Sequence, residues 1–179
     1  NNEYTVLKKP CSGFDLSKLK DFNFIFDKMI KNNNSIYSLI GQCRLATDGK
    51  SYIEEYNHPA IYDNICLVHN GIILNSPDIL QSQNLNKIQV DNNKTNHTQS
   101  DTLNFAKIIS NFENDYEREF NKVNKILNGS YSISFFNKQN QSMYLTSNNR
   151  SLYFFYNNTI FLFASEKQTL LKILHSFKI

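Results

Sequence analysis

A few glycines and one isolated arginine are the residues of this chain whose types and spacing could do chemistry. Only five glycines occur in 179 residues, and Arg44 lies between Gly41 and Gly49, while Gly71 closes the run 69–71, His-Asn-Gly. Glycine is needed where a backbone must approach a ligand closely, and arginine can hold a carboxylate with two parallel hydrogen bonds. With Asp101 at a predicted helix start, these residues favour a pocket for a small zwitterion. From the residues alone, a surface arginine with ordinary turn glycines is an equal alternative.

The elements that must position these residues follow from apolar periodicity. Helical spacing predicts helices over 15–30, 101–111, 113–127 and 166–174. Runs rich in β-branched and aromatic residues predict strands over 35–43, 61–68, 130–136, 143–146, 152–156 and 160–164. The Asn70-Gly71 pair predicts a turn, and the polar stretch 81–99 predicts a loop. No βαβ rhythm is present, so we expect an α+β layered sandwich with an antiparallel meander near its end.

Composition narrows the classes of function. The chain is 40% hydrophobic, with a formal net charge of +3, and we expect one domain over 1–179. Its lysines are scattered rather than clustered, so we expect no nucleic-acid partner, and no apolar run is long enough to predict a membrane span. The chain has three cysteines, Cys11, Cys43 and Cys66. An odd number does not suit a disulfide framework, and their spacing from the histidines does not suit a metal site. We therefore expect reduced thiols, a cytoplasmic protein, no metal and no cofactor.

Five short motifs in order carry a resemblance to a known family. They are 44–49 (Arg-Leu-Ala-Thr-Asp-Gly), 57–59 (Asn-His-Pro), 68–75 (Val-His-Asn-Gly-Ile-Ile-Leu-Asn), 100–102 (Ser-Asp-Thr) and 127–131 (Leu-Asn-Gly-Ser-Tyr). Together they resemble the class II glutamine amidotransferases, which are N-terminal-nucleophile hydrolases, and are most similar to the glutaminase domain of glucosamine-6-phosphate synthase. The resemblance implies a four-layer αββα sandwich of antiparallel sheets, with the first strand outside this chain.

The resemblance also implies roles for individual residues. Arg44 would bind the α-carboxylate of L-glutamine and Asp101 its α-ammonium. The Asn70 side chain and the Gly71 backbone N–H would form the oxyanion hole of the tetrahedral intermediate. Thr47 and His58 would support the pocket, although a structural hydrogen bond is the slightly favoured reading of His58. Asp48 stands where the synthase branch tends to carry histidine.

The nucleophile of this family is an N-terminal cysteine, and the chain begins Asn1-Asn2-Glu3. Cys11 lies too close to Arg44 to take that place, and the other two cysteines fall in predicted strands. Two explanations remain: an upstream segment carries the cysteine, or the protein binds without cleaving. We favour the first, because the pocket residues are all present.

Two hypotheses of function follow. The first is a glutaminase domain that hydrolyses the side-chain amide of L-glutamine and passes ammonia to an acceptor-processing synthase or isomerase domain or subunit. The second is a catalytically inactive amino-acid-binding or interaction module on the same fold. Ammonia release, or binding without release, distinguishes them.

Overall fold

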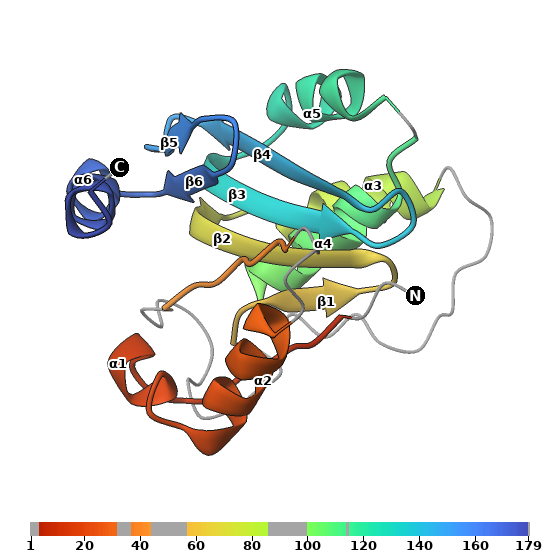
Figure 1. Cartoon of the computed structure of the whole chain (residues 1–179). Helices are drawn as coiled ribbons and strands as arrows, with labels where there is room; N and C mark the ends of the chain where they lie inside the picture. Colours follow the sequence, from red (N-terminus) through yellow and green to blue (C-terminus); the bar gives the residue numbers. More distant parts are fainter. Residues whose placement is uncertain (1–3, 32–36, 44–56, 86–99, 114, 179) are drawn as a thin grey trace.

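The computed structural model describes residues 4–31, 37–43, 57–85, 100–113 and 115–178, and it is built from helices and two antiparallel sheets (Figure 1). The helices are α1 (Gly13–Leu16), α2 (Lys20–Ile30), α3 (Ser76–Leu85), α4 (Asp101–Ser110), α5 (Tyr116–Asn124) and α6 (Lys167–Ser176). The strands are β1 (Ala60–Tyr62), β2 (Ile65–Ile73), β3 (Gly129–Asn137), β4 (Ser142–Asn148), β5 (Tyr153–Tyr156) and β6 (Phe161–Ala164). The expected α+β class with antiparallel sheets is confirmed.

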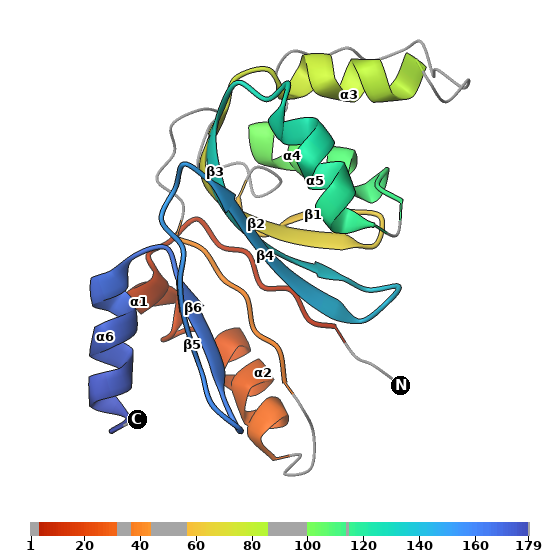
Figure 2. The same cartoon turned by 90° about the horizontal axis from the view of Figure 1, so that it is seen from above.

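The larger sheet has the order β1-β2-β3-β4, and its centre is the long β2–β3 pair. In that pair Ile65 lies opposite Asn137, and Ile73 lies opposite Gly129. One face of the pair is covered by α4 and α5, whereas the β5–β6 pair and α6 lie on the opposite side (Figure 2). The residues 4–10 and 37–43 run along that same opposite face (Figure 2). The described chain therefore shows the helix–sheet–sheet–helix order of the expected sandwich.

The core lies between the sheet and α4. Strand residues alternate between the two faces of a sheet, so one face of β2 and β3 is apolar and packs on the helices. The fully buried side chains of this core include Leu67, Phe105, Ile108, Tyr131, Ile133 and Phe135. The other face is more polar, because it carries the buried Ser132 and Ser134 and the half-buried Asn70.

Helix α4 begins where its sequence predicts. Ser100 is its N-cap residue and Asp101 its first residue, where a carboxylate faces the positive end of the helix. Its buried side chains recur at helical spacing, which directs one face onto the sheet. This placement brings Asp101 to the end of β2.

Several expectations about the elements are wrong. The first residues of the loop expected over 81–99 lie in α3 (Ser76–Leu85), and the rest of that stretch lies outside the described residues. The predicted helix over 15–30 is two helices, interrupted at residues 17–19. Residues 37–43, within the expected strand 35–43, form no strand, and their side chains are largely exposed. The meander expected over 130–164 is split, because β5 and β6 pair only with each other.

The expected turn at Asn70-Gly71 is also wrong, because both residues lie inside β2. The chain reverses earlier, between β1 and β2, where Asp63 takes a positive φ of 49°.

Candidate active site

The candidate site is at the carboxyl end of β2, where two glycines with positive φ lie in the facing strands β2 and β3. Gly71 has φ of 147° and Gly129 has φ of 144°, in a region that side-chain-bearing residues rarely adopt. A Cβ on Gly71 would lie 2.0 Å from the Ser130 carbonyl oxygen, and one on Gly129 would lie 2.2 Å from that of Ile72. Both glycines are therefore required by the same close approach of two backbones.

The backbone N–H of Gly71 points to the outer edge of β2. Tyr131, which lies opposite Gly71, donates its N–H away from β2, to Asn148 Oδ1 at 2.6 Å. Two residues further along β2, the Ile73 N–H donates to Asp101 Oδ2 at 3.0 Å. Residues two apart on an antiparallel strand direct their N–H groups to the same edge. The Gly71 N–H and the Asp101 carboxylate therefore share one edge of the sheet.

The Asn70 side chain lies on the opposite face of β2 from the buried His69. It is half-buried. A side-chain amide carries two N–H donors, and one held on a strand next to Gly71 can donate to a ligand.

Asp101 is held by several hydrogen bonds. Besides the bond from Ile73, its Oδ1 accepts the Thr102 N–H at 2.8 Å and the Thr102 hydroxyl at 3.3 Å. A carboxylate offers about four acceptor positions, so one remains for a further donor. The side chain is 24% exposed, which leaves that position accessible.

Two histidines complete the described cluster. His58 Nε2 and His69 Nδ1 each lie 3.2 Å from Thr102 Oγ1, and His69 Nδ1 is 3.8 Å from Asp101 Oδ2. Burial lowers the pKa of His69 below its ordinary value and outweighs the nearby Asp101 carboxylate, which raises it. His69 is therefore neutral at pH 7 and acts here as a hydrogen-bonding group.

Four of the six residues expected at the site are described, and the structure brings them together around the end of β2. These are His58, Asn70, Gly71 and Asp101. Arg44 and Thr47, as well as Asp48 and Gly49, lie outside the described residues.

Two neighbours of the site were not expected. Thr102 contacts both histidines and Asp101; it belongs to the Ser-Asp-Thr motif at 100–102, but that motif predicted no role for it. Arg150 is exposed, but its Nε donates to Ser130 Oγ at 2.9 Å, and its charge contributes to lowering the pKa of His69. The Ser-Tyr motif that includes Ser130 was the one signal for this contact.

The described cysteines supply no nucleophile at the end of β2. Burial raises the pKa of the half-buried Cys66 thiol, which disfavours the reactive thiolate. Cys11 and Cys43 are exposed, and all three thiols are free. The Cys43 sulfur is close to Gly13 at the start of α1, because a Cβ added there would lie 2.9 Å from it.

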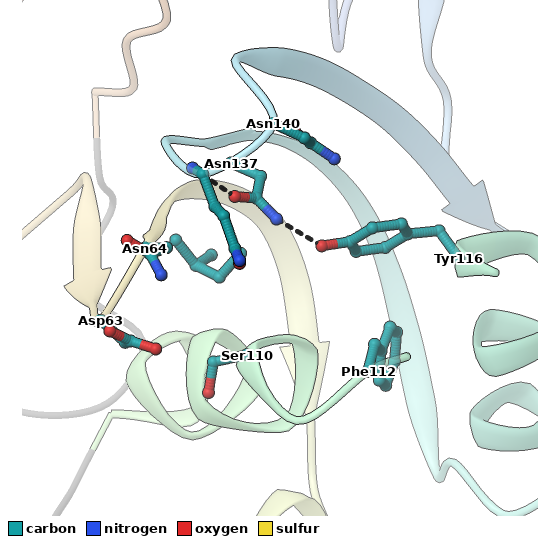
Figure 3. A pocket seen from close by; sticks show the side chains of 9 residues that line it. Asp63, Asn64, Ser110, Phe112, Tyr116, Asn137 and Asn140 are labelled. Carbon is teal, nitrogen blue, oxygen red and sulfur yellow. Dashed lines mark hydrogen bonds between the residues drawn. The ribbon is translucent and has the colours of Figure 1, made fainter. Parts of the chain in front are cut away.

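A separate cavity of about 180 Å³ lies at the other end of the β2–β3 pair. Its walls come from the β1–β2 and β3–β4 turns and from α4 and α5, and Asn137 Nδ2 donates to the Tyr116 hydroxyl across it at 2.6 Å (Figure 3). None of the residues expected at the site lines it.

The described residues contain no cluster of three or more histidine, cysteine, aspartate or glutamate side chains that could hold a metal ion. Among the same residues, no helix is both long and apolar enough to span a bilayer.

Comparison with known proteins agrees with this geometry. Residues 42–172 match the family model described as the glutamine amidotransferase domain. The glutamine–fructose-6-phosphate aminotransferases (isomerizing) of Bacillus spizizenii and Bacillus subtilis are 29% and 28% identical to the chain over 143 residues. Each alignment covers 77% of this chain and 23% of the relative, so the chain spans about a quarter of the length of these relatives.

A solved structure shares the fold. The glutamine phosphoribosylpyrophosphate amidotransferase of B. subtilis, complexed with ADP and GMP, superposes with a TM-score of 0.50 at 19% identity. The superposition covers 72% of this chain and 28% of that one. The family model includes most of the chain, including the whole of the β2 edge with its glycine and carboxylate. The chain therefore belongs to the glutamine amidotransferase domain family.

Proposed function

We propose that this domain is the glutaminase part of a class II amidotransferase and binds L-glutamine at the end of β2. The carrying observation is the shared edge at which the Gly71 N–H and the Asp101 carboxylate lie, next to the half-buried Asn70. Attack on the side-chain amide of glutamine turns its carbonyl oxygen into an oxyanion. Two fixed N–H donors, from Asn70 and Gly71, stabilise such a charge.

The rest of the substrate would be held by charge. The remaining acceptor position of Asp101 suits the α-ammonium group. Following the resemblance, Arg44 would hold the α-carboxylate, with Thr47 beside it. His58 would act indirectly, through its contact with Thr102.

The nucleophile in this proposal is an N-terminal cysteine on a segment that precedes Asn1. Its thiolate attacks the amide carbon, the carbon–nitrogen bond breaks, and the α-amino group of the same cysteine delivers the proton with which ammonia leaves. Water then hydrolyses the thioester to glutamate and restores the thiol. We propose that the ammonia reaches an acceptor domain or subunit of the same assembly, with a sugar phosphate as the acceptor, as named for the Bacillus relatives. The free cysteines suit work in the reducing cytoplasm.

The test measures ammonia release from L-glutamine by the full-length protein as encoded. Asn70→Ala removes one donor, so we expect kcat to fall about 100- to 1000-fold, with little change in KM. The matched control is Asn121→Ala, at an exposed position of α5, and this variant should keep the parent rate. A diazo-ketone analogue of glutamine should inactivate the parent protein covalently.

The possible outcomes separate the hypotheses. Calorimetric binding of glutamine without ammonia release would identify the inactive binding module instead. Neither binding nor release would refute the proposed function. An unchanged rate in Asn70→Ala would refute the assignment of the oxyanion hole.

A further inference from the structure

The hydroxyl of Thr102 is the meeting point of three polar groups from different parts of the chain. Thr102 lies in the first turn of α4 and is 3% exposed. Its Oγ1 is 3.2 Å from His58 Nε2, 3.2 Å from His69 Nδ1 and 3.3 Å from Asp101 Oδ1. His58 lies two residues before β1, and His69 lies in β2 next to Asn70 of the candidate oxyanion hole.

Counting protons assigns a direction to each of these contacts. A hydroxyl donates one hydrogen bond and accepts two, while a carboxylate only accepts. If all three contacts are hydrogen bonds, the Thr102 hydroxyl donates to Asp101 and both imidazoles donate to the Thr102 oxygen. This requires a proton on Nδ1 of His69 and on Nε2 of His58, which is one tautomer for each ring.

The other ring nitrogen of His69 lies beside Gly71, which carries one of the proposed oxyanion donors. A Cβ added to Gly71 would lie 2.9 Å from His69 Nε2, so this nitrogen is directly behind the Gly71 backbone. Nε2 is buried and makes no hydrogen bond of ordinary geometry among the described residues, while a backbone interaction with Ser130 contributes to raising the pKa of the ring. Thr102 therefore supplies the side-chain hydrogen bond that orients the ring.

Thr102 also holds the carboxylate. Its backbone N–H and its hydroxyl both bind Asp101 Oδ1, while Oδ2 accepts the N–H of Ile73. One residue thus links the group expected to bind the substrate ammonium to the ring behind Gly71.

We propose that Thr102 is a positioning residue of the glutaminase site, whose hydroxyl orients both Asp101 and the His69 ring. The inference rests on the proposed function, because Thr102 itself touches no substrate. Its loss changes the site without removing any group expected to contact glutamine.

The experiment compares Thr102→Ser, which keeps the hydroxyl, with Thr102→Val, which keeps the shape and removes it. Nitrogen–proton correlation spectra of the imidazoles report the tautomers, with His69→Gln used to assign the His69 signals. The matched control is Thr169→Val, in which an exposed hydroxyl 3.5 Å from Glu166 in the first turn of α6 is removed. Glutamine affinity is measured by calorimetry and ammonia release by kinetics, both on the full-length protein.

We expect Nδ1–H on His69 in the parent protein and in Thr102→Ser, and a shift towards Nε2–H in Thr102→Val. Because misplacement of a site by about 1 Å can cost about 100-fold in rate, Thr102→Val should lower kcat/KM by roughly 10- to 100-fold. Thr102→Ser should restore most of that loss, and Thr169→Val should behave as the parent does.

The proposal is overturned by Nε2–H on His69 in the parent, a result that needs no folded variant. It is equally overturned if Thr102→Val matches Thr102→Ser in tautomer and in glutamine affinity. If the parent neither binds nor hydrolyses glutamine, the proposed function fails and the positioning role fails with it. In that case the parent tautomers still decide whether the hydrogen-bond network exists.

Discussion

Replacing Gly71 with alanine is the sharpest test of how β2 and β3 meet. The new Cβ would lie 2.0 Å from the Ser130 carbonyl oxygen, whereas carbon and oxygen in a close sheet contact are about 3.3 Å apart. The strands must therefore separate by about 1.3 Å at this point. The moving atom belongs to backbone, so no side-chain rotation can relieve the overlap.

The expected cost follows from two contributions. Alanine at a φ of 147° costs about 1–3 kcal/mol in backbone strain. Separation of the strands weakens the hydrogen-bonded pair of Ile72 with Ser130, whose two bonds are each worth about 0.5–1.5 kcal/mol. The free energy of unfolding should therefore fall by roughly 2–6 kcal/mol, which is a large part of the 5–15 kcal/mol typical of a domain.

Urea unfolding followed by circular dichroism measures this cost, since the chain has no tryptophan for fluorescence. Gly41→Ala is the matched control, because a Cβ there meets nothing within 4 Å, and it should leave stability within about 1 kcal/mol of the parent. Should Gly71→Ala unfold at the parent's urea midpoint with the same slope, the close approach of β2 and β3 would be wrong.

Three further outcomes are expected. Asn75→Ala removes two side-chain bonds, each 2.8 Å long, that tie the end of β2 to the segment before β3; it should cost about 1–3 kcal/mol in urea unfolding, while Asn121→Ala should cost nothing measurable. Burial lowers the pKa of His69, so below about pH 6.5 the unfolded chain binds more protons than the folded one, and stability falls with decreasing pH by at most about 1.4 kcal/mol per pH unit. Denaturation between pH 5 and pH 8 should show a flatter profile for His69→Gln, and equal profiles would contradict the burial. Leu67→Ala, at a fully buried position, should cost about 2–5 kcal/mol, whereas Leu74→Ala, 63% exposed, should cost much less, and equal losses would contradict the assigned core.

Elements with strong local patterns could be predicted from the sequence. The α4 boundaries follow from a capping pair and helical spacing, and the strands after residue 129 follow from aromatic and β-branched runs separated by asparagine-rich turns. The partners of these strands could not be predicted, because pairing depends on contacts distant in sequence. This is why β5 and β6 were expected in one meander with β3 and β4.

Asn70-Gly71 shows how a local rule fails. An Asn-Gly pair favours a tight turn because both residues tolerate positive φ. In this fold Gly71 is needed because a Cβ there would overlap the backbone of β3. Gly129 in β3 is needed for the same reason, because a Cβ there would overlap the backbone of β2. Glycine is favoured both in a tight turn and in a strand whose neighbour leaves no room for a side chain. Only the tertiary structure shows which of the two situations applies to Gly71.

The candidate site was predictable only in part. His58, Asn70, Gly71 and Asp101 were expected from ordered motifs, and they are neighbours in the structure, although their catalytic roles remain predictions. Thr102 was missed because its importance comes from three contacts made by separate elements. No spacing along the chain encodes such a convergence.

Stability and function are coupled at this end of the sheet, because the same backbone contact shapes the fold and the oxyanion hole. Alanine substitutions at Gly71 and Gly129 can separate the effect on stability from the effect on function. Alanine at either position strains the Ile72–Ser130 pair to a similar degree. Both variants should therefore lose similar stability, and the double variant should lose less than the sum, because the two changes disturb one contact. Alanine at position 71 keeps the backbone N–H proposed to bind the oxyanion but must shift it as φ changes from 147°, so at a temperature at which both variants remain folded, Gly71→Ala should lose far more glutaminase activity than Gly129→Ala. Equal residual activities would mean that the glycine of β2 is there for the fold alone, and that the oxyanion donor must be sought elsewhere.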